Sequence, residues 1–218
     1  MIPTEMDERA GAPVVLTVPG LGNSGPDHWQ TLWEQARQDT ERVDLGLWDD
    51  PRRDQWVARL DAAIGAAHPP VILVAHSLGC HAVAWWAALH APPYGWPVAA
   101  AILVAPPDLD RADRPAEIAD FAPAAACPLP FPALVVASGD DPYCALDRAR
   151  GLASGWGAGF LAVGDHGHLN AASGLGRWPR GQALLDAVID AVGGVAADAP
   201  PVRIDWPALA AASAPVAA

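Results

Sequence analysis

Apolar positions along the chain follow two patterns, short continuous runs and longer segments with a helical repeat. The short runs are rich in β-branched residues, which is typical of strands buried on both faces of a parallel sheet. The longer segments repeat their apolar residues every three or four positions, as Trp29, Leu32, Trp33 and Ala36 do. Strands are predicted at 14–18, 43–48, 71–75, 98–104, 133–137 and 160–163, and helices over 29–36, from Asp50-Pro51 onward, over 78–90 and over 182–192.

Strands and helices that alternate in this way predict a doubly wound, mostly parallel α/β sheet of about six strands. Two stretches depart from the pattern. Residues 106–132 are rich in Pro and Ala and lie between two predicted strands, which is typical of a lid or a specificity insertion. Residues 194–218 are biased toward Ala and Pro, and they predict a loosely attached tail behind a single domain of residues 1–193.

Length and charge narrow the class of protein. A chain of 218 residues fits one domain with a sizeable core. The formal net charge of −12 argues against nucleic acids and anionic membranes as partners. The apolar runs are too short to span a bilayer, and the first residues lack the apolar segment of a signal peptide. Three cysteines without metal-type spacing, Cys80, Cys127 and Cys144, favour a reducing compartment, so we expect a cytoplasmic protein.

All 13 basic residues are arginines, because the chain contains no lysine. A lysine Schiff base and the phosphate-binding P-loop are therefore excluded. A serine nucleophile activated by lysine is excluded for the same reason. If the chain carries a serine nucleophile, its base should be a histidine.

The most specific motif is Ala75-His76-Ser77-Leu78-Gly79, which follows a buried apolar run and precedes a predicted helix. A serine at a tight strand-to-helix turn has its hydroxyl exposed, and small residues around it let neighbouring elements approach. The helix that follows directs its N-terminus toward the site, which favours developing negative charge. Ala75 replaces the usual first glycine and still fits. We predict that Ser77 is a nucleophile and that His76 points away from it as a structural residue.

A serine nucleophile needs a base and an acid that orients the base, and in this kind of fold the chain order is serine, acid, histidine. The predicted strand 133–137 leads into Asp140 and Asp141, and the last predicted strand is followed by His166 and His168. We choose Asp141 as the acid, with Asp140 as its rival. The alternative is that these aspartates merely cap the next helix. We choose His168 as the base in preference to His166.

Acyl transfer also needs hydrogen-bond donors for the oxyanion. One predicted donor is the N–H of Leu78, directly after the nucleophile, and the other is Leu21, in the glycine-containing loop after the first strand. A phosphate-binding loop is the rival interpretation, but Pro19-Gly20-Leu21-Gly22 lacks the required glycine spacing. His28 and Trp29 follow this loop. They either line the substrate pocket or cap and pack the next helix.

These segments together resemble the YdeN-like serine hydrolases, small α/β-hydrolases whose human relative is a retinoblastoma-binding serine hydrolase. The resemblance implies an α/β-hydrolase fold, a triad of Ser77, Asp141 and His168, and ester hydrolysis of the carboxylesterase type. The human relative has an L-x-C-x-E motif, whereas the nearest stretch here, 78–82, lacks the glutamate, so that partner is not expected. The resemblance covers roughly residues 13–192 and rests on Gly20-Leu21-Gly22-Asn23-Ser24, Asp27-His28-Trp29-Gln30, the Ser77 motif, Asp140-Asp141-Pro142 and Gly167-His168.

The predicted function is hydrolysis of a small, neutral or apolar acyl ester through an acyl-enzyme on Ser77. Few arginines lie near His168 in sequence, and the nearest are Arg177 and Arg180. A site with so few positive charges favours an uncharged acyl group. The alternatives are an acyltransferase that uses the same residues and a non-catalytic protein-binding module on the same fold. We expect no cofactor and no metal, a small-molecule ester as the substrate, and neither nucleic acid nor membrane as a partner. The sequence leaves the oligomeric state open.

Overall fold

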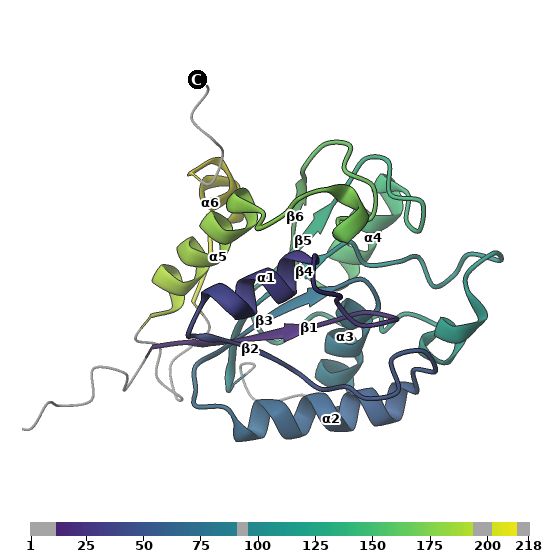
Figure 1. Ribbon diagram of the computed structural model, residues 1–218, viewed down its shortest axis with the longest axis horizontal. Coiled ribbons are helices and arrows are strands. Elements are labelled where there is room, and N and C mark those ends of the chain that lie inside the picture. Colours follow the sequence, from purple (N-terminus) through teal and green to yellow (C-terminus); the bar gives the residue numbers. More distant parts are fainter. Residues whose placement is uncertain (1–11, 91–95, 194–201, 213–218) are drawn as a thin grey trace, which may run out of the picture.

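Six parallel strands form one sheet with the order β2-β1-β3-β4-β5-β6, as Figure 1 shows for this computed structural model. The structure describes residues 12–90, 96–193 and 202–212. All five neighbouring pairs of strands are parallel. The predicted doubly wound α/β sheet is therefore confirmed. The strands are β1 (Val14–Val18), β2 (Thr40–Arg42), β3 (Val71–His76), β4 (Val98–Val104), β5 (Ala133–Ala137) and β6 (Gly159–Ala162).

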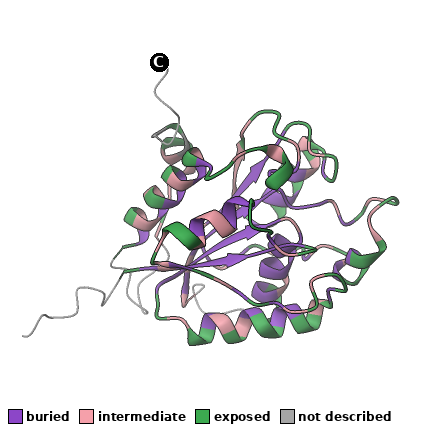
Figure 2. Cartoon of the chain, viewed as in Figure 1, coloured by how far each residue is buried: buried purple, intermediate pink, exposed green. Residues whose placement is uncertain are grey.

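Helices cover both faces of the sheet (Figure 1). One face is covered by α2 (Arg53–Ala66), α3 (Leu78–His90) and α4 (Leu146–Gly155), and the other by α1 (Trp29–Ala36), α5 (Pro179–Val192) and α6 (Trp206–Ala212). Within the described residues, two short 3-10 helices, η2 (Ala116–Phe121) and η3 (Ala171–Ser173), lie in the connecting segments. In Figure 2 the central strands are mostly buried, and the outer surfaces of the helices are exposed.

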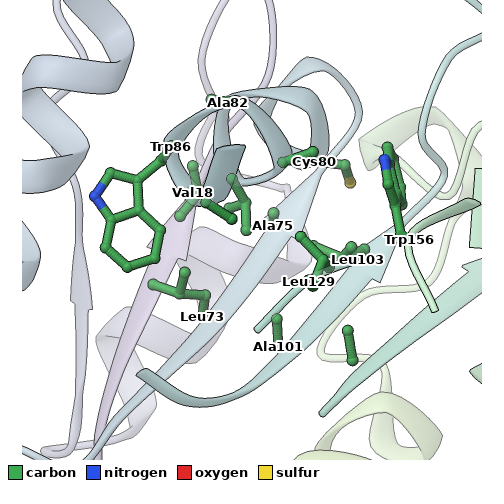
Figure 3. Close-up of a cluster of buried hydrophobic side chains, with 14 of the residues drawn as sticks. Val18, Leu73, Ala75, Cys80, Ala82, Trp86, Ala101, Leu103, Leu129 and Trp156 are labelled. Carbon is green, nitrogen blue, oxygen red and sulfur yellow. The ribbon is translucent and has the colours of Figure 1, made fainter. Parts of the chain in front are cut away.

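Strand β3 shows why the central strands read as continuous apolar runs. Successive side chains of a strand point to opposite faces of the sheet. Leu73 and Ala75 therefore pack into the core beneath α2 and α3, whereas Ile72 and Val74 pack into the core beneath α1 and α5. Figure 3 shows the first of these cores, with Trp86 of α3 beside the strands. Both alternating positions are apolar because both are buried.

The second strand lies earlier than the sequence predicted. Strand β2 covers Thr40–Arg42, and residues 43–48 are not a strand. The strand is at the edge of the sheet, so its pairing with β1 involves polar residues that need not be buried. Val43 and Leu45 are buried nonetheless, because the chain turns into the core after the strand ends. The apolar run at 43–48 thus indicated buried side chains, although the strand itself ends before this run.

Two helices also differ from the prediction. Helix α2 begins at Arg53 rather than at Asp50-Pro51, and its first N–H donates to Asp120 Oδ2 at 2.8 Å. The cap comes from a residue far away in sequence, which a local capping signal does not reveal. Helix α4 was not predicted. Its N-cap residue is Ala145, without a side-chain cap, so neither Asp140 nor Asp141 caps it.

The segment 106–132 packs onto the domain at η2. Ile118 and Phe121 are buried, and the indole N–H of Trp85 donates to the Phe121 carbonyl at 2.9 Å. Arg111, earlier in the segment, donates to the Pro142 carbonyl beside the predicted acid. These contacts hold the segment against α3 and the loop after β5.

Part of the predicted loose tail is ordered against the sheet. Helix α6 packs on β6 and α5, and the Trp206 ring lies so close to Gly159 that a Cβ there would be 2.5 Å from the ring. Trp206 is partly buried against the core beneath α1 and α5, so this part of the predicted tail contacts the domain. The rest of 194–218, apart from 202–212, lies outside the described residues.

Among the helices that the structure describes, none has the length and hydropathy needed to cross a bilayer.

Candidate active site

The carboxyl ends of β1 and β3 lie next to each other where the chain changes direction along the sheet. The chain passes from β1 to β2 on one side and from β3 to β4 on the other. Open α/β sheets bind their ligands at such a switch point. The loops that leave β1 and β3 carry Leu21 and Ser77, and those that leave β5 and β6 carry Asp141 and His168. The topology thus gathers these residues at one edge of the sheet.

Ser77 forms the turn between β3 and α3 with a φ of 54°, a left-handed conformation that strains a residue with a side chain. Two glycines make room for this turn. A Cβ on Gly20 would lie 2.8 Å from the Ser77 Cβ, and a Cβ on Gly79 would overlap the Val18 carbonyl oxygen. The Cys80 N–H closes the turn by donating to the Ser77 carbonyl at 3.0 Å. Close packing therefore holds the serine in its strained conformation.

Ser77, His168 and Asp141 form one hydrogen-bonded chain. The His168 Nε2 lies 2.8 Å from Ser77 Oγ, and its Nδ1 lies 3.0 Å and 2.9 Å from the two oxygens of Asp141. The imidazole is 9% exposed and the carboxylate 3%, so little water competes for these contacts. The Tyr143 N–H donates to Asp141 Oδ1 at 2.9 Å and helps to fix the carboxylate. With the Nδ1 proton directed at Asp141, Nε2 is the atom that can accept the serine proton.

The two rival residues make different contacts. Asp140 is exposed, and its Oδ1 accepts hydrogen bonds from the Ser138 hydroxyl at 2.8 Å and the Gly167 N–H at 2.7 Å. These bonds lower the pKa of the Asp140 carboxyl. His166 is exposed, and its N–H donates to Ser138 Oγ at 2.8 Å. Asp140 therefore fixes the turn that leads to His168.

A cavity of about 440 Å³ lies over Ser77 and His168. Pro107, Pro115 and Ile118 of the segment 106–132 form part of its wall. Among the described residues that line it there is no arginine. The described parts of the chain also contain no group of three or more His, Cys, Asp or Glu side chains that could hold a metal ion. The apolar wall includes Leu21, Leu78, Pro107, Pro115 and Ile118, and the polar wall includes Asn23, His28, His76, Tyr143 and Asn170.

The two predicted oxyanion donors border this cavity. Leu78 is the first residue of α3, so its N–H has no acceptor one turn earlier in the helix. The helix N-terminus also adds partial positive charge at this point. Leu21 lies on the loop after β1 and is 36% exposed. A Cβ on the preceding Gly20 would lie 3.1 Å from the Leu78 nitrogen, which shows how closely this loop approaches the turn at Ser77.

His28 both caps α1 and lines the cavity, so the two roles left open by the sequence coincide. Its Nδ1 accepts the Gln30 N–H at 3.2 Å, which places the proton of the neutral ring on Nε2. This Nε2 is buried and has no hydrogen-bond partner among the described residues. Burial, together with the positive charge of Arg42, lowers the pKa of His28 to about 4. The ring is therefore a neutral donor in the cavity wall.

Trp29 does not line the cavity, which corrects its prediction as a substrate contact. The side chain is 1% exposed, and its indole N–H donates to the Leu169 carbonyl at 2.8 Å. Its ring packs on those of Trp33 and Trp178, with centroids 4.7 Å and 5.2 Å away. The indole therefore supports the loop that carries His168.

His76 was expected to point away from the nucleophile, but the structure places it in the cavity wall. Its Nε2 lies 2.9 Å from the His168 carbonyl oxygen, and the two imidazole rings are 5.0 Å apart. The only signal in the sequence is its place at the carboxyl end of a strand, directly before Ser77. Its partner is 92 residues away, so the pattern of the chain does not reveal the contact.

Comparison with known proteins identifies the family and supports the fold. The family model described as serine hydrolase matches residues 15–187. A protein from Pectobacterium atrosepticum named as a YdeN-like hydrolase has a TM-score of 0.73 at 29% identity, over 83% of this chain and 92% of that one. The ydeN gene product of B. subtilis (TM-score 0.64, 21% identity, 82% and 98% of the chains) shares the fold. The type II thioesterase BorB from the borrelidin biosynthetic cluster also shares the fold, with a TM-score of 0.56 at 16% identity over 82% of this chain and 92% of that one. No curated protein matches the chain.

Proposed function

The chain belongs to the serine hydrolase family, and on this premise we propose that it cleaves small carboxylic esters through an acyl-enzyme on Ser77. It is thus an enzyme of the serine hydrolase type, and its resemblance to YdeN-like hydrolases is confirmed. The observation that carries the finer proposal is the continuous chain from Ser77 Oγ through His168 to Asp141, at a strained turn beneath a cavity.

In the proposed reaction, Ser77 Oγ attacks the acyl carbon while His168 Nε2 accepts the hydroxyl proton. Asp141 holds the imidazole in the required tautomer and stabilises the imidazolium. The N–H groups of Leu78 and Leu21 donate to the oxyanion of the tetrahedral intermediate. His168 then gives its proton to the leaving alkoxide. A water molecule, deprotonated by His168, attacks the acyl carbon and releases the acid and Ser77.

The cavity supports a small, uncharged acyl group. Its volume lies within the range of about 300–1,000 Å³ that is common for small-molecule sites. Leu21, Leu78 and Ile118 offer apolar contacts, and the polar wall offers His28 as a neutral donor. Because no arginine lines the described cavity, a carboxylate on the substrate would lack an ionic partner there. We therefore propose neutral esters as the substrate class.

The test combines labelling and turnover. A fluorophosphonate probe should label the parent protein at Ser77, as read by peptide mass spectrometry, and should not label Ser77→Ala. Hydrolysis of a short p-nitrophenyl ester should fall at least about a thousandfold in Ser77→Ala. Ser154→Ala, which changes an exposed serine on α4, serves as the matched control and should behave like the parent.

Other outcomes would support the two rival functions. A folded parent protein without label at Ser77 would contradict the hydrolase mechanism and favour a protein-binding module. An ester panel with added alcohols addresses the acyltransferase. If transfer to the alcohol exceeds hydrolysis in water, the acceptor is not water and the proposal of hydrolysis is wrong.

We also propose a cytoplasmic location. Cys80, Cys127 and Cys144 are all free thiols, and Cys80 and Cys144 are buried. Burial raises the pKa of the Cys144 thiol to about 12, so this side chain is unreactive. Free thiols are the usual state in a reducing compartment.

A further inference from the structure

The loop that carries His168 is fixed at its backbone on both sides of this residue. Before it, the N–H groups of His166 and Gly167 donate to Ser138 and Asp140, in the loop after β5. After it, Leu169 has a φ of 49°, an uncommon left-handed conformation for a residue with a branched side chain. A strained backbone at this point persists only if its surroundings hold it.

The carbonyl groups of His168 and Leu169 accept hydrogen bonds from side chains of other elements. The Nε2 of His76, at the end of β3, lies 2.9 Å from the His168 oxygen, and the indole N–H of Trp29, at the start of α1, donates to the Leu169 oxygen at 2.8 Å. A carbonyl oxygen only accepts, so His76 must carry its proton on Nε2. Both donors are buried, with His76 5% and Trp29 1% exposed, so water does not replace them readily.

His76 is also the residue directly before Ser77. The end of β3 therefore sets the position of the serine through the chain and that of its base through a hydrogen bond. The rings of His76 and His168 are in contact, with centroids 5.0 Å apart. Burial is the largest cause that lowers the pKa of His76 well below its usual value. His76 is thus neutral and places no fixed charge beside the base.

We propose that His76 is a positioning residue that holds the His168 imidazole at hydrogen-bonding distance from Ser77, and that Trp29 supports the same loop. This inference rests on the proposed hydrolase function. It assigns a role to His76 and Trp29 through contacts with the backbone of the base, not with the substrate. A displacement of the base by about 1 Å is enough to slow such a reaction by about a hundredfold.

The experiment compares two replacements of His76. His76→Gln keeps a donor N–H at nearly the position of the imidazole Nε2, whereas His76→Leu keeps apolar volume and removes the donor. We expect His76→Leu to lower kcat for a short p-nitrophenyl ester at least about tenfold with KM changed less than about twofold, and His76→Gln to restore most of the loss. Trp29→Phe should lower kcat in the same manner.

Trp33→Phe is the matched control. Its indole N–H donates to Arg177 O at 2.7 Å, so the control loses the same kind of bond to the same connection, nine residues beyond His168. It should leave kcat and KM unchanged. A second measurement is the NMR signal of the proton between His168 Nδ1 and Asp141. We expect this signal to broaden in His76→Leu and to remain sharp in His76→Gln and Trp33→Phe.

The outcomes separate this inference from the proposed function. If the parent hydrolyses esters and His76→Leu, folded by circular dichroism, has the same kcat and the same proton signal, His76 does not position the base. An equal loss in His76→Gln and His76→Leu would also overturn the inference, since the donor would then be irrelevant. If the parent itself hydrolyses no ester, the proposed function fails, and the proton signal still decides whether His76 orders the His168 ring.

Discussion

Asp140 and Asp141 are neighbours with the same chemistry, yet their carboxylates contact different atoms. Asp141 lies against His168 Nδ1 and is shielded from water, whereas Asp140 is exposed and accepts from the Ser138 hydroxyl and the Gly167 backbone. At the scale of the residue, Asp141 orients the imidazole ring of His168, whereas Asp140 fixes the turn that precedes it. The first contact determines which nitrogen carries the proton, and the second determines where the backbone lies.

Substitution of each aspartate by asparagine should separate these two roles. In Asp141→Asn an amide faces His168 Nδ1 and favours the wrong tautomer, so we expect kcat for p-nitrophenyl acetate to fall about a thousandfold or more. Asp140→Asn keeps an oxygen that accepts the Gly167 N–H, so we expect a loss of about tenfold or less. Steady-state kinetics on the two variants measure the loss of kcat in each relative to the parent. Equal losses in both would contradict the assignment of Asp141 as the acid.

The Nε2–H of His28, for which the described residues offer no hydrogen-bond acceptor, leads to a second prediction at this scale. His28→Asn keeps an N-cap acceptor for the Gln30 N–H and removes the imidazole donor from the cavity wall. A buried donor without a partner destabilises a fold by about 1–3 kcal/mol, so its removal should leave the melting temperature unchanged or raise it. We expect KM for small esters to rise several-fold. An unchanged KM in His28→Asn would show that the imidazole donor does not contact the substrate.

At the scale of elements, the site depends on how closely α3 approaches β1. Gly79 lies against the Val18 carbonyl, and this contact brings the first turn of α3 beside the loop that carries Leu21. We expect Gly79→Ala to lower the free energy of unfolding by more than about 2 kcal/mol, because the new methyl group overlaps fixed backbone. Urea unfolding measures this change.

Gly65→Ala provides the matched control for this substitution. Gly65 also lies within a helix, and a Cβ there would contact nothing within 4 Å. Alanine favours helix over glycine by about 0.5–1 kcal/mol, so this variant should be slightly more stable than the parent. If Gly79→Ala behaved like Gly65→Ala, the close approach of α3 to β1 would be wrong.

The sequence predicted elements well where local pattern and burial agree. Strands β3, β4 and β5 are buried on both faces, so their continuous apolar runs identified them. Strand β2 was misplaced because an edge strand needs few apolar residues, and α2 began later than expected because Asp120 supplies its cap. Motif and chain order led to the residues that the fold brings together around Ser77. The contacts of His76 and Trp29 with the His168 loop were missed, because each spans more than ninety residues of chain.

At the scale of the whole molecule, histidines are buried on both sides of the sheet. His28 and His76 lie at the cavity, and His81 lies in α3, where its Nε2 is 2.7 Å from the Pro107 carbonyl oxygen. Burial lowers the pKa of His81 to about 4, as it does for His28. In the unfolded chain these groups bind protons below about pH 6.5. Folding therefore keeps three imidazoles neutral that would otherwise be charged in mild acid.

The last prediction concerns how these lowered histidine pKa values make the free energy of unfolding depend on pH. Between about pH 6.5 and pH 4 the unfolded chain binds more protons than the folded protein, so the free energy of unfolding should fall as the pH is lowered through this range. A histidine whose pKa drops from 6.5 to about 4 contributes about 2 kcal/mol of this loss at pH 5. Urea unfolding at pH 7.5 and pH 5 measures the difference. His81→Gln should reduce it by about that amount, whereas His68→Gln, which changes an exposed histidine, should leave it as in the parent. The same difference in the parent and in His81→Gln would mean that His81 is not held neutral by the fold.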